Sequence, residues 1–128
     1  MKILLCIGLG GFFGAIARYG MTAGIQHWTA GSRLGDFPAG TLAVNLLGCL
    51  ILGFLGHLLT ERFEMAAEIR FAITVGFIGA FTTFSTFAYE TLAMAREGDW
   101  LFAWLNLLAS NALGILAVWG GYRIGGLV

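Results

Sequence analysis

The segment GAFTTFSTFAYET, residues 79–91, combines hydroxyl groups, aromatic rings and one carboxylate within an apolar run. In a continuous helix, five polar residues spaced three and four apart share one face. They are Thr82, Ser85, Thr86, Tyr89 and Glu90. Three phenylalanines, Phe77, Phe81 and Phe84, lie roughly opposite, and Phe87 flanks them. A helix that only faces lipid does not need a hydroxyl face ending in a carboxylate, so this segment is the first candidate site.

These residue types suit the passage of a small anion. A phenylalanine ring has a negative face and a positive edge, so rings presented edge-on favour an anion without supplying a full positive charge. A full charge would hold the ion too long, because conduction requires sites that the ion can leave. Hydroxyl and amide hydrogens supply the remaining solvation. The alternative is purely structural: the hydroxyls bond to their own helix and the rings pack against lipid.

Two other apolar runs carry polar stripes. Asn45 lies near the middle of its run with Thr41 one turn earlier, and Asn106 and Ser110 are one turn apart in the last run. An asparagine amide offers two donors, although an interhelical hydrogen bond that serves assembly alone is the competing interpretation. We expect the three stripes to meet around a path that contains water.

Composition places the chain in the membrane. Of its 128 residues, 59% are hydrophobic and 11% are charged, whereas a soluble domain carries about 25% charged residues. The formal net charge is zero, so no basic patch points to nucleic acid as a partner. A spanning helix needs roughly 20 apolar residues. The charge-poor runs therefore predict one all-α membrane domain, residues 1–128, with four transmembrane helices at about 3–26, 37–59, 71–94 and 100–121.

The first run raises two further questions. Its basic start and the small residues at 15–17 resemble a secretion signal. The spacing of Gly10 and Gly14 is instead typical of close helix packing in lipid, and we favour this interpretation. Arg18 is the only charged residue within residues 3–32. It either extends its head group to the membrane surface or binds a partner group.

The charges that flank the spans give little bias in orientation. A four-span topology places Lys2, Arg62, Arg70 and Arg123 on one side of the membrane, and Arg33 and Arg96 on the other. The positive-inside rule compares Lys and Arg on the two sides, and here the difference is slight. Insertion in both orientations, and hence an antiparallel dimer, is therefore permitted. Four helices are also few to enclose an aqueous path, so we expect an oligomer, most simply a dimer.

The third span is expected to be weak near its centre. Glycines at 76 and 79 and threonines at 82 and 83 have low helix propensity. A break at membrane depth is tolerated only where it is buried in protein or lines a cavity. Carbonyl groups freed at a break could coordinate a monovalent cation.

Three segments resemble the Fluc family of fluoride channels, also known as the camphor-resistance membrane proteins: GGFFGAIARY, TLAVNLLG and GAFTTFSTF. The resemblance covers essentially the whole chain. It implies an antiparallel, dual-topology homodimer with two pores, each built by both subunits. It also implies that helix 3 is broken at its centre, with a structural Na⁺ on the dimer axis held by the backbone carbonyls of Gly79 and Thr82.

The resemblance further implies which residues line the fluoride pore. They comprise two phenylalanines, the asparagine of the second helix, hydroxyl residues of three helices and a carboxylate further along the path; Thr41 is included for its place one turn before the asparagine. The set is Asn45, Phe84, Phe87, Ser85, Thr86, Ser110, Thr41 and Glu90. Two positions of helix 4 depart from the family pattern. Asn106 stands where some relatives carry a tyrosine, and Gly114 where a second hydroxyl is expected.

In function, the resemblance implies a channel for passive export of fluoride. Hydrogen fluoride enters acidified cells as the neutral acid and dissociates inside, and the trapped anion leaves down its electrochemical gradient. The expected partners are fluoride, a second copy of the chain and the lipid bilayer, with the protein multi-pass in the inner membrane of a bacterial cell. An enzyme is not expected, because no nucleophile–base pair or set of metal ligands is evident.

The main alternative is an exporter of the small multidrug-resistance type, which exchanges protons for organic cations. Its chemistry needs a membrane-embedded carboxylate in the first helix, where this chain has only Arg18. Glu90 would have to serve through a different design. A structural subunit with no transport of its own is a second alternative, and the combination of hydroxyl groups and rings argues against it.

Overall fold

The chain is all-helical over the part that the computed structural model describes, residues 1–32, 36–61 and 65–128. The elements are α1 (Lys2–Thr29), α2 (Ala39–Glu61), α3 (Ala67–Phe71), the π-helical segment η1 (Ala72–Ile78), α4 (Gly79–Phe81), α5 (Phe84–Arg96) and α6 (Trp100–Gly125). They give four helical spans long and apolar enough to cross a membrane, which confirms the prediction from the charge-poor runs. Two of the charges counted for orientation, Arg33 and Arg62, lie outside the described residues.

Three of the four observed spans are longer than predicted, and α2 has the predicted length but lies two residues later. α1 continues to Thr29 and α6 to Gly125, because helical hydrogen bonding does not stop where an apolar run ends. The third span begins at Ala67 rather than at 71. Its first turn comes from the charged connector, and Glu68 lies in that turn, where the positive end of the helix dipole favours a carboxylate.

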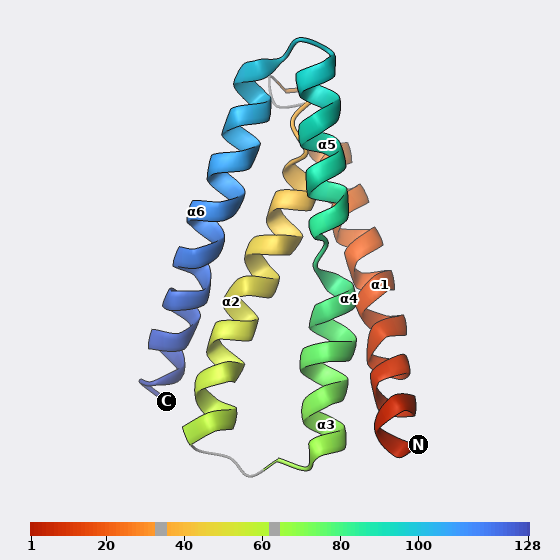
Figure 1. Ribbon diagram of the computed structural model, residues 1–128, viewed down its shortest axis with the longest axis vertical. Helices are drawn as coiled ribbons and strands as arrows, with labels where there is room; N and C mark the ends of the chain where they lie inside the picture. Colours follow the sequence, from red (N-terminus) through yellow and green to blue (C-terminus); the bar gives the residue numbers. More distant parts are fainter. Residues whose placement is uncertain (33–35, 62–64) are drawn as a thin grey trace.

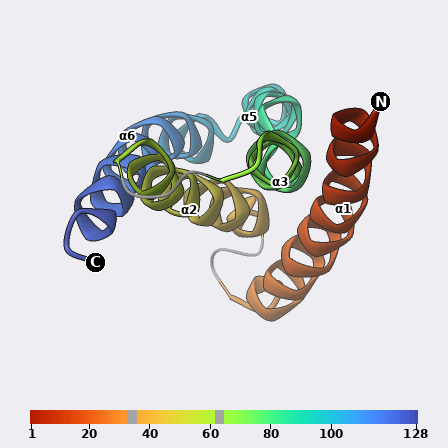
Figure 2. The same ribbon diagram turned by 90° about the horizontal axis from the view of Figure 1, so that it is seen from below.

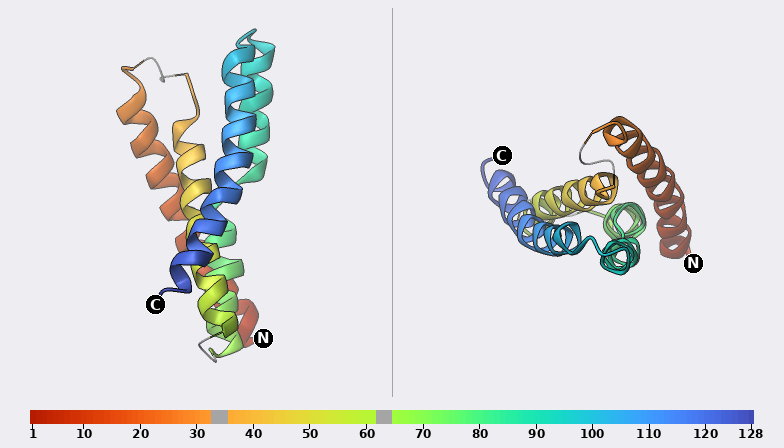
Figure 3. Two further views of the ribbon diagram at one scale, coloured as in Figure 1. Left: turned by 90° about the vertical axis from the view of Figure 1, so that its left-hand side faces the viewer. Right: turned by 90° about the horizontal axis from the view of Figure 1, so that it is seen from above.

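The helices pack in two pairs. α2 lies along α6, and α1 lies along η1 and α4; Figure 2 shows the resulting row, with α6 and α2 on one side of α3 and α1 on the other. Both chain termini lie at the same end of the molecule (Figure 1). Toward the opposite end, α1 diverges from α5 and α6 (Figure 3, left). The bundle therefore opens away from the termini.

Glycines set the closest helix contacts. A Cβ added at Gly10 or Gly14 of α1 would overlap carbonyl oxygens of η1, and one at Gly53 or Gly121 would overlap carbonyl oxygens across the α2–α6 contact. The absence of side chains at these positions lets the backbones approach closely, which favours helix association in lipid. The predicted packing role of the first two glycines is confirmed.

The backbone changes direction between α4 and α5. Thr82 (φ −89°, ψ 158°) and Thr83 (φ −151°, ψ 111°) are extended, and the change is visible in Figure 1. Side-chain faces are therefore not continuous across these residues. The Phe77 and Phe81 rings stack, with centroids 5.9 Å apart and planes at 8°, while Phe84 contacts Phe87 instead, at 5.5 Å. The expected stripe of rings from 77 to 84 is wrong, because it assumed one unbroken helix.

Candidate functional site

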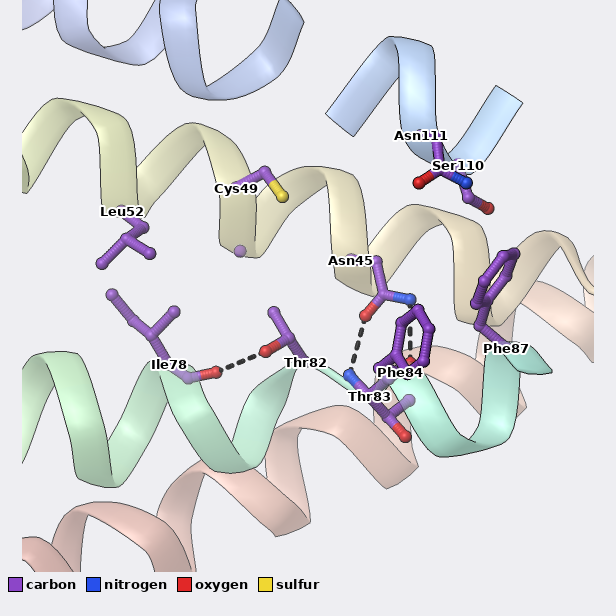
Figure 4. Close-up of a pocket in the computed structure, with 11 residues that line it drawn as sticks. Asn45, Cys49, Leu52, Ile78, Thr82, Thr83, Phe84, Phe87, Ser110 and Asn111 are labelled. Atoms are coloured by element: carbon purple, nitrogen blue, oxygen red, sulfur yellow. Dashed lines mark hydrogen bonds between the residues drawn. The ribbon is translucent and has the colours of Figure 1, made fainter. Parts of the chain in front are cut away.

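Asn45 of α2 holds both backbone groups of Thr83. Its Oδ1 accepts a hydrogen bond from Thr83 N at 2.8 Å, and its Nδ2 donates to Thr83 O at 3.1 Å. Figure 4 shows the two bonds side by side. A backbone group that leaves the helical ladder inside a membrane needs another partner. Asn45 supplies both partners, so this side chain fits the extended residues in the middle of the third span.

The Thr83 side chain caps the helix that follows. Its Oγ1 accepts from Thr86 N at 3.3 Å and donates to Thr86 Oγ1 at 2.9 Å. Threonine is favoured at this position because its oxygen satisfies an amide at the start of a helix. On the other side of the extended residues, Thr82 Oγ1 donates to Ile78 O at 3.0 Å. Side chains thus take over hydrogen bonding where the backbone ladder is interrupted.

A first pocket, of about 250 Å³, lies between α2, α6 and the start of α5 (Figure 4). Its lining residues are Asn45, Gly48, Cys49, Leu52, Ile78, Thr82, Thr83, Phe84, Phe87, Ser110 and Asn111. Four of the predicted pore residues, drawn from three helices, are therefore brought together. The two rings differ in exposure: Phe87 is 6% exposed, whereas Phe84 is 77% exposed.

A second pocket, of about 380 Å³, lies on the α1 side of Thr83. It is lined by Arg18, Tyr19, Thr22, Ala23, Gln26, Thr41, Thr83 and Thr86. It contains two further predicted pore residues, Thr41 and Thr86. Thr83 lines both the first and the second pocket, so only this extended residue and its neighbours separate them.

A third pocket, of about 290 Å³, adjoins the second and shares Thr22 and Gln26 with it. Its other lining residues are Asp36, Pro38, Glu90, Ala93, Met94 and Glu97. Thr41 Oγ1 donates to Glu90 Oε1 at 2.8 Å. The second carboxylate oxygen, Oε2, is buried without a hydrogen-bond partner among the described residues. The three pockets, taken in this order, are called the polar track below.

Some predicted residues lie away from the polar track. Ser85 and Tyr89 are exposed on the surface of the subunit, so the hydroxyl face expected for a continuous helix is divided between the surface and the track. Gly79 is also exposed. Asn106 is buried, and its amide contacts α5 rather than a pocket. Of the two polar residues of the last span, only Ser110 therefore lines the polar track.

Sequence reasoning left the role of Arg18 open and missed several other residues of the track. Arg18, Thr22 and Gln26 of α1 all line the second pocket. They are spaced four apart, which places them on one helix face, so their spacing carried a signal that could have been read. Cys49 also lines the first pocket, and a lone cysteine in an apolar run gives no sequence signal of such a position.

Comparison of the sequence with known proteins assigns the chain to a family. A sequence profile described as CrcB-like protein, Camphor Resistance (CrcB), matches residues 5–122. A protein named fluoride-specific ion channel FluC from Methylococcus capsulatus is 48% identical over 118 residues, 92% of this chain and 50% of that protein, so the chain spans only half of that relative. Proteins of the same name from Magnetococcus marinus and Nitrosococcus oceani are 43% and 40% identical. The matches cover 95% and 98% of this chain, and 96% and 97% of those proteins.

Proposed function

The chain belongs to the CrcB-like, camphor-resistance family, and we propose that it is a fluoride-selective channel through which fluoride leaves the cytoplasm passively. The observation that carries the proposal is the polar track: three pockets share lining residues and place neutral donors on both sides of Thr83. The protein is located in the inner membrane of a bacterial cell, and its chain crosses that membrane several times. Transport of this kind involves no covalent chemistry, so the protein is not an enzyme.

In this proposal the ion enters through the second and third pockets, where α1 diverges from α5. Arg18 lines the second pocket and attracts an anion, while Glu90 in the third is held to one side by Thr41. The hydroxyl group of Thr86, whose oxygen accepts from Thr83, then replaces part of the ion's water, while the hydroxyl hydrogen of Thr41 is given to Glu90. Neutral donors suit this task, because they solvate an anion without holding it as tightly as a second full charge would.

The first pocket completes the path past Thr83. One amide hydrogen of Asn45 is used by Thr83 O, and the second is available to an ion. Ser110 adds a hydroxyl, and the rings of Phe84 and Phe87 add their positive edges. Selectivity against chloride then follows from a narrow passage whose donors fit the smaller ion.

The exposed face of α5 supports an antiparallel homodimer with two pores. Phe84 and Tyr89 are 77% and 75% exposed, and Ser85 is exposed beside them. A second copy with the opposite orientation would cover this face. Ser85 would then complete the partner's pore, while Phe84 and Phe87 line the pore of their own subunit. Dual topology is compatible with the slight difference in flanking Lys and Arg residues.

The extended residues also fit the proposed structural Na⁺. In a continuous helix, the amides of Thr83 and Thr86 would bond to the carbonyl oxygens of Gly79 and Thr82. Here those amides bond to Asn45 Oδ1 and Thr83 Oγ1 instead. The two carbonyls are thereby left to a hard cation, which prefers oxygen ligands. Bound there, Na⁺ would balance the carbonyl dipoles at the dimer axis.

The proposal is tested by fluoride efflux from liposomes that contain the purified protein, measured with a fluoride electrode and with chloride as the control ion. We expect rapid release of fluoride and no release of chloride. Absence of fluoride release from folded protein would contradict the proposal. Proton-coupled uptake of an organic cation would point instead to an exporter of the small multidrug-resistance type, in which Glu90 would carry the proton.

A further inference from the structure

Asn106 stands apart from the other polar residues of the spans. Its side chain is 1% exposed, and it is not among the residues that line the polar track. An amide removed from water costs free energy unless its donors and acceptor are paired. The role of Asn106 therefore follows from the hydrogen bonds that its side chain forms.

These bonds connect two residues of the first pocket through the interior of the subunit. Asn106 Nδ2 donates to Thr91 Oγ1 at 2.8 Å, and Thr91 Oγ1 donates to Phe87 O at 2.7 Å. On its other side, Asn106 Oδ1 accepts from Ser110 Oγ at 3.4 Å. The chain Ser110–Asn106–Thr91–Phe87 therefore begins and ends at residues that line the first pocket.

The hydroxyl hydrogens in this chain have defined directions. Thr91 gives its single hydrogen to Phe87 O, which leaves its oxygen to accept from Asn106. Ser110 gives its hydrogen to Asn106 and so presents lone pairs, rather than a donor, to the pocket. The Ser110–Asn106 distance is 3.4 Å, whereas bonds between an O–H and an oxygen are usually about 2.7–2.8 Å. This bond is long enough to be exchanged for a bond to an anion.

We infer that Asn106 is a positioning residue of the channel. It ties α6 to α5 through Thr91, which fixes the rotation of α5 and with it the place of the Phe87 ring. It also holds the Ser110 hydrogen until an anion reaches the first pocket, when the hydroxyl rotates and donates to the ion. The inference rests on the proposed function, and Asn106 itself contacts no ion.

The test is a double-mutant cycle of Asn106→Ala and Thr91→Val, read as single-channel fluoride current in planar bilayers. Single-channel current does not depend on how many channels fold, so a merely structural role would leave it unchanged. We expect each single variant to lower the current, and to raise the fluoride concentration at half-maximal current, by about fivefold, the equivalent of one net hydrogen bond. The double variant should lose less than the product of the two single losses, because both act through one chain of bonds.

Two further variants keep the result interpretable. Thr91→Ser retains the hydroxyl and should restore most of the current that Thr91→Val loses. Thr74→Val is the matched control, because Thr74 donates only within its own span, to Arg70 O at 2.8 Å, and it is not among the residues lining the polar track. Its current should match that of the wild type. If Asn106→Ala does not fold, the comparison of the currents of Thr91→Val and Thr91→Ser still tests the inference.

Two results would overturn the inference: a wild-type current in Thr91→Val, or losses that multiply in the double variant. Either of them, in a wild-type protein that conducts fluoride, rejects the role of Asn106 alone. A wild-type protein that conducts no fluoride rejects the proposed function, and the inference with it.

Discussion

Two kinds of helix contact divide this molecule, and they differ in what they leave between the helices. Along α1–η1 and α2–α6, glycines bring backbones together directly. Around α5, side chains of neighbouring helices form hydrogen bonds instead: Asn45 bonds to Thr83, Thr41 to Glu90, and Asn106 to Thr91. The first kind fills the space between helices. The second kind separates the helices by polar groups and leaves the pockets of the polar track.

The difference teaches how a small chain can combine rigidity with a hydrated path. Glycine contacts depend on shape, and they tolerate no added carbon without movement of the backbone. A buried hydrogen bond contributes only about 1 kcal/mol net, so the groups around α5 can exchange partners with an ion at modest cost. Substitutions at the two kinds of contact should therefore differ in their effects on stability and on transport.

The largest effect is expected at the glycine contacts. Gly121→Ala places a carbon against the Leu50 carbonyl, and overpacking of this kind costs about 3 kcal/mol. The adjacent Gly120 has open space around it, so Gly120→Ala is the matched control and should leave stability unchanged. Thermal unfolding in detergent measures both. Equal unfolding temperatures for the two variants would show that the close α2–α6 contact is not required.

A smaller loss of stability, with a large loss of flux, is expected at Asn45. Asn45→Leu leaves the amide of Thr83 unpaired and removes the side-chain bond to its carbonyl, which costs about 2 kcal/mol, and it removes a donor from the first pocket. Asn111→Leu is the control for stability, because Asn111 Nδ2 donates to Leu107 O of its own helix. In thermal unfolding, we expect Asn111→Leu to unfold at the same temperature as the wild type and Asn45→Leu to unfold at a lower temperature. Fluoride efflux from Asn45→Leu at the wild-type rate would remove this residue from the pore.

Substitution of the two phenylalanines of the first pocket should affect the stability of the subunit differently but reduce fluoride transport in both cases. Phe87→Leu changes a ring that is 6% exposed and should lower the stability of the subunit by about 1 kcal/mol. Phe84→Leu changes a ring that is 77% exposed and should leave subunit stability unchanged. Both should reduce fluoride efflux, since both rings line the first pocket. If Phe84→Leu conducts like the wild type, the exposed ring plays no part in either pore.

The smallest effect is expected from a thiol reagent. Cys49 lines the first pocket, whereas Cys6 of α1 is not among the residues lining the polar track. A small methanethiosulfonate should therefore reduce fluoride efflux partially in Cys6→Ser and not at all in Cys49→Ser. The reverse pattern would place the path away from the first pocket.

The sequence predicted the spans, and seven of the eight residues proposed for the pore line the track. The physical reason is that uncompensated polar groups are costly in lipid, so polar residues in apolar runs mark where helices meet. Asn45 and Ser110, from different runs, do line one pocket. The spacing of Arg18, Thr22 and Gln26 held the same kind of signal for α1, and it was overlooked because only the charge of Arg18 was considered.

The sequence could not show where faces change at the extended residues. Thr82 and Thr86 would lie on one face of a continuous helix, yet they line different pockets, because two residues between α4 and α5 are extended. Nor does spacing distinguish Ser110, which lines a pocket, from Asn106 one turn earlier, which is buried against α5. A difference of this kind depends on the partner helix, here on Thr91.

The central claim, that this chain is a passive and selective fluoride channel, is tested most directly by the reversal potential in a planar bilayer with unequal fluoride and equal chloride on the two sides. We expect the current to reverse at the equilibrium potential of fluoride and not to shift when a chloride gradient or a pH gradient is added. A reversal potential that follows chloride or the proton gradient would contradict it.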